Sequence, residues 1–330
     1  MTSRFRQLLL AGLPLLVAGC SDGLQSVMNP QGSQADQIAR LAWLLFGAGT
    51  GVLVIVAGCV LFALWGSDRI RRILAQRRTI VILGIAFPAI ALSVLLAYGL
   101  SLMRPLQDDG RQKPLRIEVV GEQWWWRVRY ADDGEGAVDS ANEIRIPVGI
   151  PIELTLKSTD VIHSFWVPNL AGKVDMIPGR PTHLRLRANA AGIYRGQCAE
   201  YCGGAHALMA MQVFAMPEAE FRAWLRREAS VGRAPREEAE IQGEAVFSGA
   251  GCGACHAIRG TTASGNIGPD LTHVGSRQSL GANTLALTHA NLVRFIVNGQ
   301  DVKPGNRMPE FRIFSSDEVR ALADYLMSLK

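Results

Sequence analysis

Two cysteines, a histidine and a methionine lie close together in the sequence and form the first group with evident metal chemistry. Cys198, Cys202, His206 and Met209 follow one another at intervals of four, four and three residues, so one short loop can present all four side chains. Thiolate and thioether sulfurs are soft ligands and imidazole is intermediate, a combination that selects copper over hard cations. A tetrahedral zinc site rarely includes methionine. A disulfide between the two cysteines is the remaining alternative, and it leaves His206 and Met209 without a role.

A second group has the spacing of a c-type haem attachment site. Cys252 and Cys255 are separated by two residues and followed directly by His256. Both thiols can therefore bond to the haem while the imidazole binds the iron. Met308 is the candidate for the opposite axial position. His/Met ligation leaves no open iron position and raises the reduction potential, which suits electron transfer rather than oxygen binding. A zinc site or a disulfide at these cysteines explains neither His256 nor Met308.

The copper loop lacks a second histidine, which two metal ions bridged by two thiolates require. The candidate is His163, in the segment 160–168. Together with the pattern Cys-x-Glu-x-x-Cys-x-x-x-His-x-x-Met that begins at Cys198, it closely resembles the dinuclear copper (CuA) centre of cytochrome c oxidase subunit II. The resemblance covers residues 35–217 and includes the aromatic segment 121–126.

This resemblance implies a role for each residue of the copper site. Cys198 and Cys202 would bridge the coppers as thiolates, and His163 and His206 would each bind one copper. Met209 and the backbone carbonyl of Glu200 would be weak ligands. The side chain of Glu200 would also hold magnesium at the face toward subunit I. Trp124 would accept electrons above the copper, whereas Trp125 and Trp126 are expected to be packing residues.

The copper ligands lie in a region with the pattern of β-strands. Between residues 105 and 217, short runs of alternating or β-branched residues are separated by Gly, Pro and Asp/Asn clusters, which predicts an all-β sandwich or barrel. The expected strands are 117–121, 143–147, 152–157, 161–167, 183–186 and 209–214.

The haem ligands lie in a region with the pattern of helices. The charged segment 218–240 predicts a helix that runs into a linker, and helices are expected over 282–298 and 315–330, the second capped by Ser316. The segment 267–271 resembles the loop that packs on the haem edge in class I cytochromes c.

The first third of the chain predicts a membrane anchor. Two uncharged runs, 41–65 and 79–103, are each long enough to cross a hydrocarbon layer of about 30 Å. Five arginines and one aspartate lie between them and indicate a cytoplasmic loop. Residues 1–19 resemble a lipoprotein signal peptide, after which Cys20 would be acylated; an uncleaved anchor is the alternative. The copper and haem regions are then expected on the outer face of the membrane.

The charge distribution agrees with this arrangement. The net charge of +5 comes from the first 104 residues, which hold nine arginines against three aspartates. The rest of the chain is close to neutral, so no basic face for nucleic acid is expected.

The resemblance therefore implies a multidomain membrane protein of the caa3 type of haem–copper oxidase. A two-helix transmembrane hairpin (20–104) would precede an all-β cupredoxin-like Greek-key barrel (105–217), a linker (218–240) and an all-α cytochrome c domain (241–330). Such a subunit receives electrons at its covalent haem and delivers them through CuA to subunit I, where oxygen is reduced to water with proton translocation. The other implied partners are subunit III, a soluble or membrane cytochrome c or another donor, and the lipid of a bacterial inner membrane.

Two other functions stay open at the level of the sequence. One is the electron-input subunit of a CuA-containing nitric oxide reductase. The other is a membrane-anchored copper-delivery protein, against which Met209, Glu200 and the haem region argue. A quinol-oxidase subunit is excluded because those relatives lack the copper ligands. One departure from the family matters: residues 75–79, at the start of the second apolar run, contain no glutamate, which puts proton uptake through this subunit in doubt.

Overall fold

The computed structural model describes residues 23, 25–102, 113–131 and 137–330. The predicted signal peptide 1–19 and Cys20 lie outside these residues. The chain divides into two compact units, Asp36–Arg111 and the combination of Met1–Ala35 with Gln112–Lys330.

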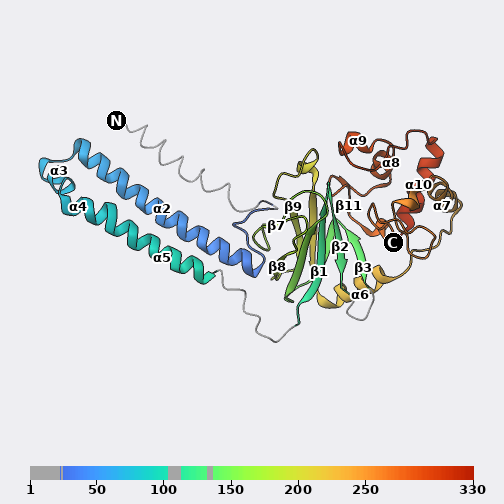
Figure 1. Ribbon diagram of the computed structural model, residues 1–330, viewed down its shortest axis with the longest axis horizontal. Helices are drawn as coiled ribbons and strands as arrows, with labels where there is room; N and C mark the ends of the chain where they lie inside the picture. The colour runs from blue at the N-terminus through green and yellow to red at the C-terminus, as the bar shows by residue number, and fades with distance from the viewer. Residues whose placement is uncertain (1–22, 24, 103–112, 132–136) are drawn as a thin grey trace, which may run out of the picture. The chain divides into compact units, whose positions relative to one another are not determined.

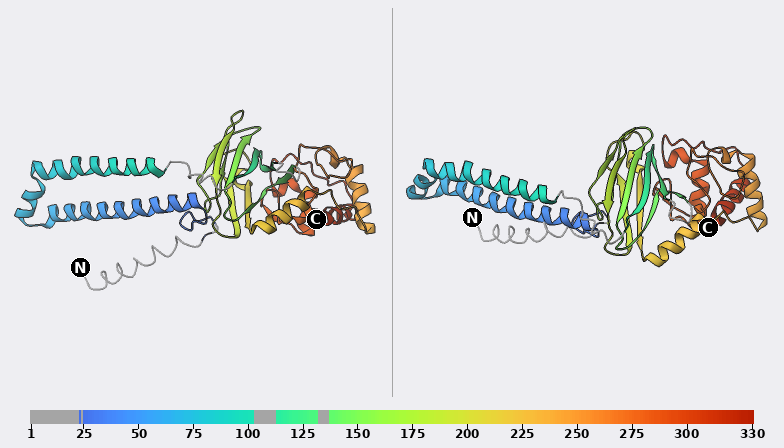
Figure 2. Two further views of the ribbon diagram at one scale, coloured as in Figure 1. Left: turned by 90° about the horizontal axis from the view of Figure 1, so that it is seen from below. Right: turned by 60° about the horizontal axis from the view of Figure 1, so that its bottom comes forward.

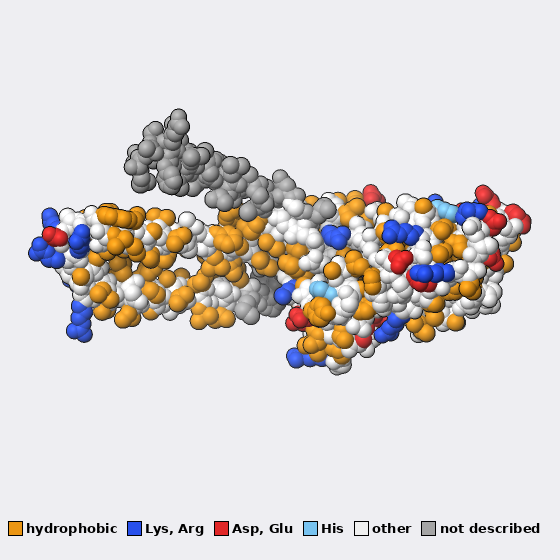
Figure 3. Space-filling model, turned by 90° about the horizontal axis from the view of Figure 1, so that it is seen from above, with side chains coloured by type: hydrophobic (Ala, Val, Ile, Leu, Met, Phe, Trp, Pro, Cys, Tyr) orange, Lys and Arg blue, Asp and Glu red, His pale blue; other side chains and the backbone are white. Residues whose placement is uncertain are grey.

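The first unit contains a helical hairpin with two spans long and apolar enough to cross a membrane, 33–65 and 77–102. Its elements are α2 (Ser33–Trp65), α3 (Asp68–Leu74), α4 (Arg77–Val81), the π-helical segment η2 (Ile82–Ala86) and α5 (Phe87–Leu102). Hydrophobic side chains cover the hairpin, and basic side chains gather at its tip around α3 and α4 (Figure 3). This pattern agrees with the two predicted membrane spans and the basic loop between them.

Both spans differ in detail from the sequence prediction. Helix α2 begins at Ser33, eight residues before the predicted start. Its first turns are polar and include an i,i+4 ion pair between Asp36 and Arg40. The prediction followed only the apolar run and therefore began too late. The second span contains η2, which ends two residues before Pro88. Proline has no N–H for the i→i−4 ladder, and a π-helical turn is one way in which a helix accommodates that loss.

The β domain is a sandwich of two five-stranded sheets, as predicted, with cupredoxin-like mixed topology (Figures 1 and 2). One sheet has the order β3-β2-β1-β5-β8 and the other β4-β10-β9-β6-β7. In each sheet one pair is parallel, β1 with β5 and β4 with β10. The strands are β1 (Leu115–Glu122), β2 (Trp125–Tyr130), β3 (Val138–Ala141), β4 (Glu143–Pro147), β5 (Ile152–Ser158), β6 (His163–Trp166), β7 (Val174–Met176), β8 (Thr182–Leu186), β9 (Gly192–Cys198) and β10 (Ala210–Met216).

The six predicted strands are present, with ends that shift by two residues or fewer. Strand β5 shows why: Ile152, Leu154 and Leu156 are buried and their neighbours are not, which is the period of two of a half-buried strand. The sequence did not indicate β2, β3, β7 and β9. Strand β9 carries Arg195 and Gln197 on either side of Gly196, so its hydrophobic signal is weak.

The segment 218–240 begins with a helix, as predicted. Helix α6 (Glu218–Ala229) packs on β3 and β4, and its Phe221 and Trp224 are buried against Tyr130. Burial of each such aromatic side chain contributes about 1.5–3 kcal/mol. After α6, the carbonyl of Ser230 accepts hydrogen bonds from His273 and Arg259. The segment is therefore held to both domains.

The C-terminal domain is mainly helical around its own core. Its elements are α7 (Glu238–Gly249), η4 (Cys252–Ala254), η5 (Val274–Ser276), β11 (Ser279–Leu280), β12 (Leu285–Ala286), α8 (His289–Val297), α9 (Gly299–Val302) and α10 (Ser316–Ser328). Helices α7 and α10 cross closely at Gly243, where an added Cβ would lie 2.0 Å from the carbonyl oxygen of Ala321.

Two predictions for this domain were wrong. The expected helix 282–298 is only α8, because Ala282 and Asn283 have positive φ angles and form the turn of the β11–β12 hairpin. Helix propensity there is overridden by tertiary contacts of the turn. The cap of the last helix is Ser315 rather than Ser316: its hydroxyl accepts from the Glu318 N–H, and the Glu318 carboxylate accepts from the Ser315 N–H.

Candidate metal and haem centres

One end of the β sandwich brings together all six donors predicted for copper. His163 lies on β6, Cys198 ends β9, and the others follow in the loop 199–209, which contains η3 (His206–Leu208). The two sulfurs lie 3.8 Å apart. His163 Nδ1 is 3.8 Å from the sulfur of Cys198, and His206 Nδ1 is 3.4 Å from that of Cys202. The arrangement is a pair of sulfurs with one imidazole beside each.

The two weaker donors lie on opposite sulfurs of this pair. Met209 Sδ is 3.8 Å from the sulfur of Cys202, and the carbonyl oxygen of Glu200 is 3.2 Å from that of Cys198. The side chain of Glu200 itself is exposed. This donor set of two thiols, two imidazoles, one thioether and one carbonyl fits two copper ions and does not fit a single tetrahedral zinc.

The state of the two thiols favours metal binding over a disulfide. Cys198 and Cys202 are buried free thiols. The hydrogen bond with the Cys202 thiol, followed by those with His163 and backbone N–H groups, lowers the pKa of Cys198 to about 4 against the opposing effect of burial. The thiolate is the form that binds metal, so this lowering of the pKa of Cys198 favours the metal-binding form.

His163 is oriented by two residues whose roles sequence reasoning missed. Its Nε2 lies 2.9 Å from Oδ1 of Asp160, which leaves Nδ1 facing the sulfur. Burial raises the pKa of Asp160, but hydrogen bonds from the Gln123 N–H and from His163 lower it further, so the carboxylate stays charged. At Gly121, a Cβ would lie 2.8 Å from the imidazole ring. The one sequence feature from which the pair of Asp160 and His163 could have been predicted is their spacing of three residues.

The indole of Trp124 packs directly against the copper loop. Its Nε1 donates to the carbonyl of Cys202 at 3.0 Å, and its ring is the nearest neighbour of Gly204. By contrast, Trp126 is fully buried beside Phe165, and Trp125 lies under the guanidinium of Arg127. The structure thus separates one indole at the loop from two that pack, as the sequence predicted.

The predicted haem motif has the geometry of an iron-binding imidazole. Cys252, Cys255 and His256 lie in and just after the η4 turn, and both thiols are free. His256 Nδ1 lies 2.8 Å from the carbonyl of Pro269, which can only accept, so Nδ1 carries the proton and Nε2 is left as the donor for iron. Burial lowers the pKa of His256, which keeps the imidazole neutral.

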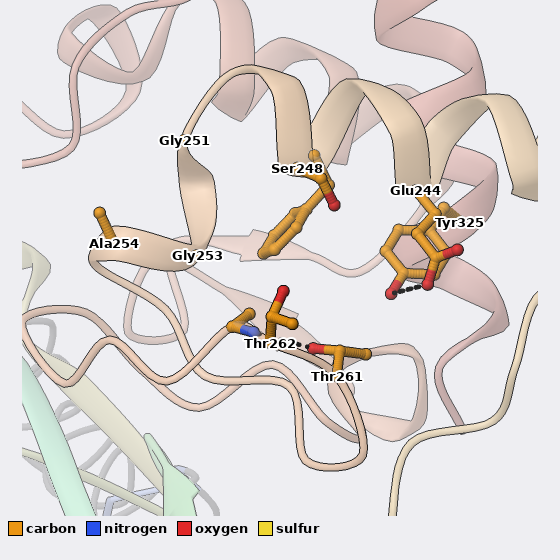
Figure 4. A pocket seen from close by; sticks show the side chains of 10 residues that line it. Glu244, Ser248, Gly251, Gly253, Ala254, Thr261, Thr262 and Tyr325 are labelled. Atoms are coloured by element: carbon orange, nitrogen blue, oxygen red, sulfur yellow. Dashed lines mark hydrogen bonds between the residues drawn. The ribbon is translucent and has the colours of Figure 1, made fainter.

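Met308 lies at the edge of the haem domain's core together with several half-buried apolar side chains. Leu271, Phe295 and Phe311 are among those that pack there. An apolar wall of this kind suits a porphyrin. A separate cavity of about 300 Å³ lies between α7, α10 and the segment 261–263, with Glu244 and Tyr325 at one end (Figure 4). Its lining includes Gly253 and Ala254 but none of the four predicted haem ligands.

Gly268 offers a direct test of the haem assignment. A Cβ at this position would lie 2.5 Å from Cε1 of His256. Gly268→Ala should therefore displace the imidazole and reduce the low-spin haem absorption, measured on the purified protein. Gly249→Ala is the matched control, since nothing lies within 4 Å of a Cβ there. An alanine at 268 that left the haem spectrum unchanged would contradict the assignment of His256.

The comparisons with known proteins cover the two domains separately and the chain as a whole. The family "Cytochrome C oxidase subunit II, periplasmic domain" matches residues 135–216, and the family "Cytochrome c" matches residues 241–330. A relative in Alkalihalophilus pseudofirmus named cytochrome c oxidase subunit 2 is 32% identical over 99% of this chain and 97% of its own length. A Bacillus subtilis relative of the same name is 28% identical over 98% and 97%. The solved periplasmic domain of subunit II from Bradyrhizobium japonicum is 31% identical over 34% of this chain and 90% of that one, with a TM-score of 0.32.

Proposed function

The chain belongs to the cytochrome c oxidase subunit 2 family, and we propose from this membership which of its residues perform the family's task. As subunit 2 of a haem–copper oxidase, it delivers electrons to subunit I, where oxygen is reduced. It uses CuA and a covalent haem c. When bound, the copper pair and the haem supply one-electron redox centres.

The observation that carries the residue assignment is the six-donor cage at the end of the β sandwich. In this proposal the thiols of Cys198 and Cys202, the Nδ1 atoms of His163 and His206, Met209 and the Glu200 carbonyl would hold the two copper ions. Four of these side chains are at most 4% exposed (His163, Cys198, Cys202 and Met209), so they exclude water and hold the donors in a fixed geometry. A fixed cage needs little reorganisation when its charge changes.

In the second domain, Cys252 and Cys255 attach the haem, and His256 and Met308 bind its iron. The hydrogen bond from His256 to Pro269 fixes the imidazole's orientation and tautomer. Trp124, on the copper loop, is the residue through which electrons reach the copper domain. We assign the domains as 20–104, 105–217 and 241–330, with 218–240 between them.

The chain is anchored in a membrane and works with subunit I and a cytochrome c donor. We place it in a bacterial inner membrane, in contact with lipid and subunit III, and with Cys20 as a lipidation site. The exposed carboxylate of Glu200 is available for magnesium at the face toward subunit I. Among the described residues 75–79, no carboxylate begins the second span, so this subunit supplies no acidic group for proton uptake at that point.

An assay of the purified complex tests this function against its closest alternative. We expect the complex to consume oxygen with a reduced cytochrome c donor and to consume nitric oxide much more slowly. We also expect this subunit to hold two copper atoms and one iron atom. Faster consumption of nitric oxide than of oxygen would favour the nitric oxide reductase. Copper without iron would favour copper delivery.

A further inference from the structure

We propose that Lys303, with the loop that it begins, is a positioning residue that fixes the haem domain over Trp124 in one orientation. The copper and haem domains belong to the same compact unit, and hydrogen bonds cross between them at the copper loop. The proposal deepens the function above, because it identifies how the two predicted redox sites are held next to each other.

Lys303 carries a buried amino group that contacts both domains. Its side chain follows α9 and is 3% exposed. The ammonium donates to the carbonyls of Trp124 at 2.5 Å and Leu208 at 2.9 Å in the copper domain, and to Gly281 at 2.9 Å in its own domain. Lys303 forms no ion pair with any residue that the structure describes. A buried charge is costly unless hydrogen bonds compensate it, so these three carbonyls account for its position.

A rigid loop connects this contact to the predicted iron ligand. Gly305 has a φ of +80°, and a Cβ there would lie 3.1 Å from the ring of Trp124. Gln300 holds the loop from inside by accepting from the Gly305 N–H and donating to the Asn306 carbonyl. The Asn306 side chain in turn accepts from the N–H of Met308. The residues from Lys303 to Met308 thus run from the copper loop to the edge of the haem site.

The copper domain contributes a buried charge of the opposite sign. Glu143, on β4, is fully buried and accepts from the backbone N–H groups of Gln278 and Ser279, at 2.6 and 3.2 Å. Between the two charged contacts, the N–H of Ala210 donates to the carbonyl of Ala282 at 3.2 Å. Each domain therefore satisfies backbone groups of the other with one buried ionisable side chain. Such reciprocal contacts select one docking orientation, in which Trp124 is covered by this chain's own haem domain.

The first test measures the contact itself, without reference to copper or haem. The protein has five lysines. In the intact complex, acetylation with N-hydroxysuccinimidyl acetate should modify the exposed Lys330 rapidly and Lys303 at least tenfold more slowly. Burial lowers the pKa of Lys303 to about 7, so its amine would be the more reactive one if reagent could reach it. Equal rates at both lysines would overturn the proposal.

The second test breaks the contact in two independent ways. Lys303→Met removes the hydrogen bonds of the amino group, and Gly305→Ala places a Cβ 3.1 Å from the ring of Trp124. Each variant should speed hydrogen exchange of the Ala210 amide by about tenfold to hundredfold. Lys330→Met and Gly249→Ala are the matched controls. Unchanged exchange in both variants would overturn the proposal. If Lys303→Met does not fold, Gly305→Ala and the labelling of the wild-type protein still decide.

The third measurement separates positioning from general stability. In the Gly305→Ala variant, which removes no charge, electron transfer from haem to copper should slow, while the potentials and spectra of both centres stay unchanged. Direct reduction of the copper by hexaammineruthenium(II) should become faster, because Trp124 is uncovered. Slower transfer with a shifted potential would instead indicate damage to a ligand site and would contradict the proposal. Absence of copper or haem would refute the proposed function, and the labelling and exchange results would still stand by themselves.

Discussion

Replacement of Cys198 by serine should abolish the near-infrared copper absorption and leave the haem spectrum intact. The cage loses a soft bridging donor, and the hydroxyl that replaces it is a poor ligand for copper. Loss of a supporting residue alone costs 10- to 100-fold in metal affinity, so loss of this ligand should cost more than about 100-fold. Electron delivery to subunit I should fall correspondingly. Copper content by atomic absorption, together with optical spectra, measures both expectations.

Cys59→Ser is the matched control for this experiment. Cys59 is a free thiol on α2, in the other compact unit. The same cysteine-to-serine change there should leave copper content and turnover as in the unaltered protein. If the copper signal survived in the Cys198 variant, the assignment of the cage would be wrong, whatever the result for Cys59.

Replacement of Met308 by alanine should leave the haem attached but lower its reduction potential by on the order of 100 mV. The thioether is the ligand that raises the potential in His/Met sites. For a one-electron centre, 59 mV corresponds to a factor of ten, so the equilibrium for reduction of this haem would shift by about fiftyfold. Redox titration followed at the haem absorption bands measures the shift.

Met327→Ala separates ligand loss from packing loss. Met327, on α10, packs on the same hydrophobic core but is not a predicted ligand. Its alanine variant should lose some stability and keep the potential. Equal shifts in both variants would mean that Met308 acts by packing, and the axial ligand would then have to be another residue.

The local motifs explain why so much of the site could be predicted. Cys252, Cys255 and His256 lie within one turn, and the segment from Cys198 to Met209 forms one loop, so sequence spacing alone places these donors together. His163 is different, because it lies on another strand. It was found by resemblance, and the structure brings its Nδ1 to 3.8 Å from the sulfur of Cys198.

Long-range packing explains the parts that could not be predicted. The segment from Ala282 to Leu287 has a helical composition. Its turn instead adopts positive φ angles, and the carbonyl of Ala282 accepts a hydrogen bond from the copper domain. Lysine is mostly exposed in proteins, so nothing in the sequence marks Lys303 as a buried cation. The role of Gly121 also could not be predicted, because it depends on the ring of His163 that packs against it in the folded protein.

Sequence patterns alone specify the donors from Cys198 to Met209 and from Cys252 to His256, the alternation that makes a β sandwich, and the apolar runs of the hairpin. Each of these depends on residues within a few turns or one strand of each other, where spacing fixes geometry. The orientation of His163 by Asp160 and the contacts of Lys303 and Glu143 between the two domains depend instead on the three-dimensional fold. Those contacts link residues far apart in the chain, and their energy comes from burial and hydrogen bonds that exist only after the chain has folded.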